Sequence, residues 1–266
     1  MSAGPATTTG SLEAALRAKR DAGRKLLVPY VMGGMSEDWV SVLQGVVAAG
    51  ADAVEVGIPF SDPVIDGPVV QEASIHALAR TTTPQSVIDG IVAAEVGVPV
   101  VVMTYYNIVF RAGHHRLASS LAQAGISGAI VPDLPLEELD PWGAEADRAG
   151  VATVLLVAPS TPETRVRRIC ERCRGFVYAV ARMGVTGERN ALGSDASAVV
   201  GRIRQATDLP VCVGIGISDA AQAVEASSVA DGVVVGSALV RRLLDGGGVE
   251  AAAAFVGELR SALDRH

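Results

Sequence analysis

The chain is poor in cysteine, lysine and aromatic residues. Its 266 residues include 3 Cys, 4 Phe, 4 Tyr and 2 Trp, and Lys19 and Lys25 are its only lysines. An odd and sparse set of cysteines argues against a disulfide framework. Cys170 and Cys173 have C-x-x-C spacing, but they lie in a charged stretch that predicts an exposed helix, and no second ligand pair completes a zinc site. We interpret this spacing as chance.

The chain also lacks a basic face and a long apolar run. Its formal net charge is −7, which makes nucleic acid an unexpected partner. No apolar run approaches the roughly 20 residues of a membrane helix. Residues 1–10 have neither the basic start nor the apolar core of a secretory signal. We expect a cytoplasmic protein with a flexible tail at residues 1–10.

What the chain does contain is an alternation of short apolar runs and Ala-rich amphipathic stretches. The runs predict eight strands, at 26–31, 53–57, 98–103, 128–131, 151–157, 176–181, 211–215 and 233–235. The stretches predict helices at 38–49, 87–95, 116–124, 136–148, 163–173, 196–206, 220–226 and 249–263. A further helix at 11–20 precedes the first strand and is suited to cover the bottom of a barrel.

This alternation predicts one α/β domain over residues 11–266. Strands that are apolar on both faces are typical of a parallel sheet covered by helices. Gly50, Gly125 and Gly150 stand where left-handed helix caps would precede strands. An open doubly wound sheet is the alternative, but eight units without a G-x-G-x-x-G turn favour a closed TIM (β/α)8 barrel, which needs about 250 residues.

A pair of carboxylates lies in the second predicted strand and in the loop after it. Glu55 lies between Val54 and Val56, and Asp66 lies in the Gly- and Pro-rich loop that follows. A buried ionised Glu is costly, so Glu55 points outward, is paired, or holds a proton for use. Working groups in such barrels come from the carboxyl ends of strands, so we expect chemistry here.

Glycine-rich loops follow the last three predicted strands, at 184–187, 214–218 and 236–238. Glycines let backbone N–H groups approach an anion, and a helix starting at Ser237 would direct its positive end at that anion. Any one glycine is also explained by a tight turn. The loops after strands seven and eight together favour a phosphate site, because this pair recurs as the phosphate site of the fold.

At this point the chain resembles the alpha subunit of tryptophan synthase. The matching segments are Pro29-Tyr30, Val54 to Gly67, Tyr105-Tyr106-Asn107, Pro132-Asp133, Tyr178 to Gly187 and the three glycine loops. The resemblance implies retro-aldol cleavage of indole-3-glycerol phosphate to indole and glyceraldehyde 3-phosphate, without metal or cofactor. It also implies an alpha2-beta2 complex in which indole passes to a beta subunit for L-tryptophan synthesis.

The resemblance assigns roles by position. Glu55 corresponds to the acid-base glutamate and Asp66 to the aspartate that engages the indole N–H. The indole pocket would be lined by Tyr30, Met103, Tyr105, Ile130, Val157, Tyr178, Thr186 and Ile215. The phosphate cradle would comprise Gly187, Gly216, Gly236 and Ser237. Arg182 would lie, with Thr186, in the loop that closes the site, and Asp62 and Pro63 in the loop that touches the beta subunit.

One departure leaves alternatives open. Relatives commonly carry Gly-Asp-Pro after the first strand, whereas this chain has Gly34-Met35-Ser36 near the side that would face a beta subunit. A standalone lyase that releases indole is therefore an alternative to a synthase subunit. A non-catalytic activator of a beta subunit gives no reason to keep both Glu55 and Asp66. A phosphosugar isomerase would need a Lys or His base at a strand end, and none is placed there.

Overall fold

The structure, a computed structural model, describes residues 11–180, 192–214 and 216–266. Its strands are β1 (Leu26–Met32), β2 (Val54–Gly57), β3 (Val100–Met103), β4 (Gly128–Ile130), β5 (Ala152–Val157), β6 (Val177–Val180), β7 (Val211–Gly214) and β8 (Gly232–Val235). All neighbours are parallel, and β8 pairs with β1, so the sheet closes into a barrel in sequence order. The predicted TIM barrel is confirmed, and every strand starts within two residues of the expected position.

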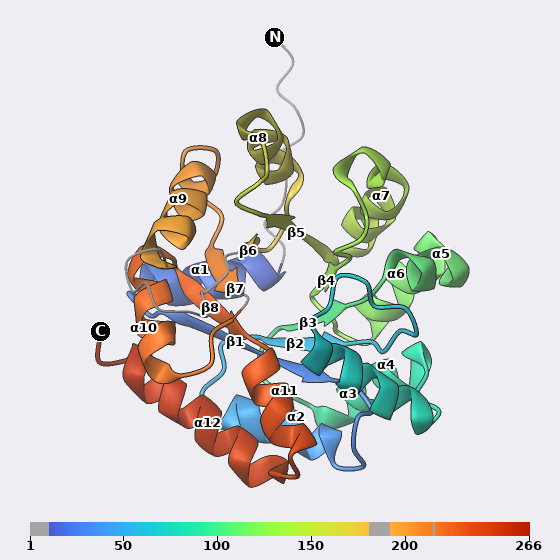
Figure 1. Ribbon diagram of the computed structural model, residues 1–266. Coiled ribbons are helices and arrows are strands. Elements are labelled where there is room, and N and C mark those ends of the chain that lie inside the picture. Colours follow the sequence, from blue (N-terminus) through green and yellow to red (C-terminus); the bar gives the residue numbers. More distant parts are fainter. Residues whose placement is uncertain (1–10, 181–191, 215) are drawn as a thin grey trace.

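A ring of helices surrounds the strands (Figure 1). The helices are α1 (Ser11–Asp21), α2 (Trp39–Ala48), α3 (Pro68–Ala79), α4 (Pro84–Ala94), α5 (Tyr106–Ala112), α6 (His114–Gln123), η1 (Leu136–Glu138), α7 (Asp140–Ala149), α8 (Glu163–Arg172), α9 (Leu192–Arg204), α10 (Ala220–Val229), α11 (Ser237–Leu244) and α12 (Gly248–Leu263). The sequence did not predict α3 or α5, and the helix expected at 136–148 is a 3₁₀ turn followed by α7. None of the helices in the described ranges is long and apolar enough to cross a membrane.

The predicted extra helix α1 closes one end of the barrel. Leu12 and Leu16 are fully buried and pack in the barrel interior with Leu26 and Phe176. A Cβ at Gly175 would overlap the Leu12 side chain, so this glycine makes room for the plug. The closed end lies where the strands begin, which leaves the carboxyl ends of the strands for a site.

The strands separate two apolar layers. Side chains such as Val101 and Val154 fill the interior, while their neighbours Val102 and Leu155 pack against the surrounding helices. Cys170 and Cys173 belong to the outer layer and are free and buried. The expected exposure of this pair is therefore wrong, because α8 is amphipathic and turns Cys170 toward the barrel, and Cys173 is buried directly after the helix ends.

Candidate active site

Glu55 projects into the barrel from β2. It stands in register with Tyr30 on β1 and Val101 on β3, both of which face the interior. The residue is 2% exposed, and its Oε2 has no hydrogen-bond partner in the described part of the chain. Burial first, and the charge of Asp66 second, raise the pKa of Glu55 to about 8. Glu55 thus carries a proton at neutral pH.

Asp66 lies at the end of the loop between β2 and α3 and is half-buried. Burial raises its pKa to about 6, while a hydrogen bond from the Tyr105 hydroxyl acts in the opposite direction. The charge of Asp66 contributes to the raised pKa of Glu55, so the ionisation of the two carboxyl groups is linked. Two acids with separated pKa values can divide the roles of proton donor and charged stabiliser.

Three tyrosines surround this pair. Tyr30 and Tyr105 are buried and Tyr178 is half-buried, and burial raises the pKa of all three, so each hydroxyl keeps its proton. The Tyr30 and Tyr178 hydroxyls occupy the positions where a Cβ on Gly57 or Gly214 would stand. This role of the two glycines was not expected from the sequence, although a Gly that ends one strand beside a Tyr in the neighbouring strand is a signal for it.

Three residues expected in the apolar wall of the pocket pack on different sides of the strands. Met103 and Ile130 pack with the interior layer. Val157 is in register with Ala179, and both pack in the outer layer against the helices. Leu156, in register with Tyr178, faces the interior in its place. Alternation along β5 makes the two residues face opposite sides.

Gly216, Gly236 and Ser237, which the resemblance assigns to a phosphate cradle, lie in the described ranges. Gly236 precedes α11, and Ser237, its first residue, is exposed. The N–H groups of Leu239 and Val240 bond back to the Gly236 carbonyl, and no side chain caps this helix start. Gly216 is exposed, with φ of +92°. Four predicted site residues lie outside the described ranges: Arg182, Thr186, Gly187 and Ile215.

The expected partner-facing loop is exposed. Asp62 is exposed and Pro63 half-buried, and the apolar Val64 and Ile65 beside them are 78% and 55% exposed. Further large apolar side chains are exposed on α3 and α5, among them Ile75 and Phe110. Exposed apolar side chains such as Val64 and Ile65 are typical of a protein–protein interface.

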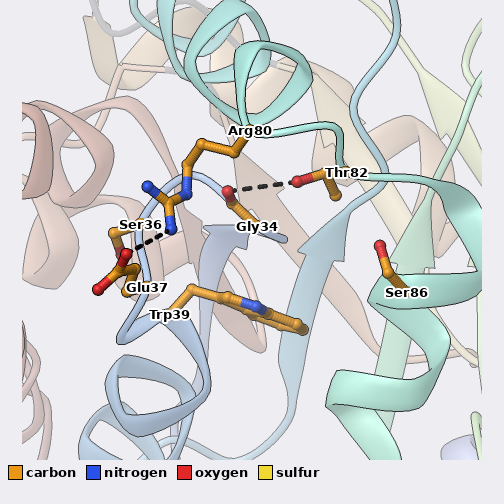
Figure 2. Close-up of a pocket in the computed structure, with 7 residues that line it drawn as sticks. All are labelled: Gly34, Ser36, Glu37, Trp39, Arg80, Thr82 and Ser86. Atoms are coloured by element: carbon orange, nitrogen blue, oxygen red, sulfur yellow. Dashed lines mark hydrogen bonds and ion pairs between the residues drawn. The ribbon is translucent and has the colours of Figure 1, made fainter.

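The loop after β1 borders a polar cavity of about 260 Å³ (Figure 2). Figure 2 shows Arg80 reaching Glu37, with an ion-pair distance of 3.4 Å, and Thr82 Oγ1 donating to the Gly34 carbonyl at 3.4 Å. Neither carboxylate of the pair lines this cavity. Met35 turns inward and packs with Val70. No group of three or more His, Cys, Asp or Glu among the described residues could hold a metal ion.

Comparison with known proteins identifies the family. A family model described as "Tryptophan synthase alpha chain" matches residues 16–260. The chain belongs to the tryptophan synthase alpha chain family. The alpha chain of Streptomyces avermitilis is 44% identical over 252 residues, which cover 92% of this chain and 91% of that one. The alpha chain of Thermobifida fusca is 45% identical over 236 residues, covering 86% and 87%.

Solved structures agree with the tryptophan synthase alpha assignment. A Mycobacterium tuberculosis tryptophan synthase structure superposes with a TM-score of 0.88 at 37% identity, covering 96% of this chain and 99% of that one. The alpha subunit from Legionella pneumophila gives a TM-score of 0.89 at 28% identity, covering 97% and 100%. The predicted family and its lyase chemistry are therefore confirmed.

Proposed function

We propose that this chain cleaves indole-3-glycerol phosphate into indole and glyceraldehyde 3-phosphate with Glu55 as acid-base group and Asp66 as charge stabiliser. The observation that carries the residue assignment is a buried, unpartnered Glu55 whose pKa is raised to about 8, beside an Asp66 whose pKa is about 6. Near pH 7 one is an acid and the other a carboxylate, as the reaction requires.

The chemistry accounts for each role. Breaking the bond at indole C3 requires protonation of that carbon, and Glu55 supplies this proton. The ring then carries positive charge delocalised toward N1, which the Asp66 carboxylate stabilises through the indole N–H. The Glu55 carboxylate next removes the proton of the glycerol hydroxyl, the C–C bond breaks, and its electrons return to the ring. Indole and the aldehyde result, and Glu55 regains its proton.

The remaining residues divide between the two ends of the substrate. Tyr30, Met103, Tyr105, Ile130 and Tyr178 form walls that suit a flat heteroaromatic ring, and we add Leu156 in place of Val157. Gly216, Gly236 and Ser237, with Gly187, hold the phosphate through backbone N–H groups and the start of α11. Arg182, Thr186 and Ile215 complete the closing loop and the pocket.

The partner is a tryptophan synthase beta subunit in an alpha2-beta2 complex in the cytoplasm, and indole passes to it. The exposed loop of Asp62 and Pro63, with Val64 and Ile65, supports this assignment. Met35 supports a second candidate, a standalone lyase. It is 6% exposed and packs inward where relatives carry a polar turn, so the loop after β1 offers a different surface.

Indole release from indole-3-glycerol phosphate separates these functions. The purified chain is assayed alone and with a beta subunit from its own source. Weak release that rises sharply with the beta subunit supports the synthase subunit, and high release without it supports the standalone lyase. No release under either condition, from a chain that is folded by circular dichroism, would overturn the cleavage assignment.

A further inference from the structure

The loop that carries Asp66 (residues 58–67, the Asp66 loop) is fastened at its start by a buried serine of α3. Ser74 is 1% exposed. Its Oγ accepts a hydrogen bond from the Phe60 N–H at 2.9 Å and donates one to the Phe60 carbonyl at 2.9 Å. A hydroxyl can do both at once, so Ser74 satisfies the donor and the acceptor of one loop residue.

A glutamine on the same helix fastens the other end of the loop. The Gln71 side-chain amide donates to the Asp66 carbonyl at 2.9 Å and to the Pro63 carbonyl at 3.4 Å. Gln71 and Ser74 are three residues apart and therefore share one face of α3. The main chain of the loop is thus tied to α3 on both sides of its turn.

An aromatic contact links Phe60, the residue that Ser74 holds, to the part of the loop next to Asp66. The Phe60 ring stacks on Tyr105, with 5.0 Å between centroids and 23° between planes. The Tyr105 hydroxyl accepts from the Ile65 N–H at 3.2 Å and acts to lower the pKa of the adjoining Asp66 carboxyl. A shift of Phe60 would therefore displace the ring whose hydroxyl holds the main chain next to Asp66.

The helix itself is held in place from its other side. Val70, Ala73 and Ala77 pack with Val240 of α11. Glu72 forms an ion pair with Arg241 of α11 at 2.9 Å. α3 therefore has a fixed neighbour in α11 and can serve as a support for the Asp66 loop.

We propose that Ser74 and Gln71 are positioning residues that hold the Asp66 carboxylate where positive charge develops on the substrate. This inference rests on the proposed function, because it assigns Asp66 the charge-stabilising role. Neither residue acts on the substrate directly; both act through the placement of Asp66. A stabilising group that is already in place does not have to move as charge develops. Its placement therefore lowers the activation barrier and raises kcat.

The first test is Ser74→Ala, with Ser227→Ala as its matched control. Ser227 is 2% exposed, and its hydroxyl also bonds a backbone carbonyl, at 2.9 Å in α10. We expect Ser74→Ala to lower kcat about tenfold, or about 1.4 kcal/mol in barrier, with little change in KM. Ser227→Ala should lower the melting temperature to a similar extent and leave kcat unchanged.

The second variant is Gln71→Met, which keeps the length of an exposed side chain and removes its donors. Its control is Gln85→Met, because Gln85 is an exposed glutamine whose amide donates to the Asp89 side chain, at 2.8 Å on α4. We expect Gln71→Met to lower kcat a few-fold and Gln85→Met to leave it unchanged. Because Gln71 is exposed, the folded state of this variant is secure even if Ser74→Ala unfolds.

The deciding measurement combines each variant with Asp66→Asn. If Ser74 and Gln71 act through Asp66, their effects on kcat vanish in the Asp66→Asn background. The same reduction of kcat with and without Asp66 would overturn the inference, as would unchanged kcat in both single variants. Failure of this inference can be told apart from failure of the proposed function, because indole release by the unsubstituted chain tests the proposed function by itself.

Discussion

Two buried carboxylates three residues apart differ in every contact. Asp52 precedes β2 at the closed end of the barrel and is fully buried, while Glu55 lies within β2 and is 2% exposed. Both come from the same helix–strand unit and both are removed from water. The comparison shows what a buried carboxylate does with partners and what it does without them.

Asp52 has a complete set of partners. Its carboxylate accepts from the Leu27 N–H at 2.9 Å, from Arg24 at 2.7 Å and from Arg260 at 3.1 Å. Lys19 lies 3.1 Å from the same group. These contacts join α1, β1, β2 and α12, so this carboxylate connects elements that are distant in sequence.

Glu55 has no cation and no donor on Oε2 in the described ranges, and its neighbours are tyrosines and another carboxylate. Without compensation, burial favours the protonated form. The difference teaches that the Asp52 carboxylate is held charged by its partners, whereas Glu55 lacks such partners and keeps its proton, which the proposed cleavage would use.

The largest effect that we expect is on activity, in Glu55→Gln. Glutamine keeps the size of Glu55 but cannot transfer a proton, so kcat should fall by about 10³-fold. The measurement is indole release, with circular dichroism as the check on folding. Glu55 would lose its proton-transfer role if this variant turned over at a tenth of the normal rate or more.

The next effect is on stability, in Asp52→Ala. Removing the carboxylate takes the buried counter-charge from Arg260, which keeps only its ion pair with the exposed Asp264 among the described residues, and the expected loss is about 3–5 kcal/mol of unfolding free energy. Urea unfolding measures it, and kcat of the folded fraction should be unchanged. Glu137→Ala, at an exposed pair with Arg165, is the control and should leave the midpoint almost unchanged.

The open end of β2 could be predicted from sequence better than the closed end. Glu55 attracts notice because a carboxylate interrupts an apolar strand, and Asp66 because it follows in a Gly/Pro loop. Asp52 gives no such signal, since an Asp after a helix-ending Gly is ordinary on a surface. Its partners Arg24 and Arg260 are far apart in the sequence, and only the closed barrel brings them together.

Two further failures have local causes. The helix α3 was not predicted because its small and apolar residues do not form a clear stripe, although Gly67-Pro68 is a favourable helix start. Ser74 was missed with it. Val157 was assigned to the pocket by position alone, whereas the alternation of side chains along β5 turns Val157 toward the helices and Leu156 toward the barrel interior.

The third prediction concerns how stability depends on pH. The pKa of Glu55 rises from 4.5 to about 8 on folding, so its contribution to stability is complete below pH 4.5 and is lost as pH rises toward 8. Glu55→Gln removes this dependence. Between pH 5 and 8 the variant should gain on the order of 3 kcal/mol relative to the unsubstituted protein. Parallel urea midpoints for the two proteins across this range would contradict a protonated Glu55.

The fourth prediction concerns the pH dependence of cleavage. kcat/KM should fall below about pH 6, where Asp66 becomes protonated, and above about pH 8, where Glu55 loses its proton, each limb changing about tenfold per pH unit. The substrate phosphate also titrates near pH 6. Asp66→Asn separates the titration of Asp66 from that of the phosphate. If kcat/KM of this variant still falls below about pH 6, the fall belongs to the phosphate.

The smallest effect tests whether the Asp52 contacts are redundant. The Lys19 side chain is 33% exposed and lies at the edge of the group, whereas Arg260 is buried beside it. Lys19→Ala leaves Arg24, Arg260 and the Leu27 N–H on the carboxylate, so the loss should be below about 1 kcal/mol by urea unfolding. A loss as large as that of Asp52→Ala would mean that Asp52 depends on each cation separately. Asp52 would then resemble Glu55 more than its contacts indicate, because the loss of a single cation would be enough to favour the protonated form of its carboxyl group.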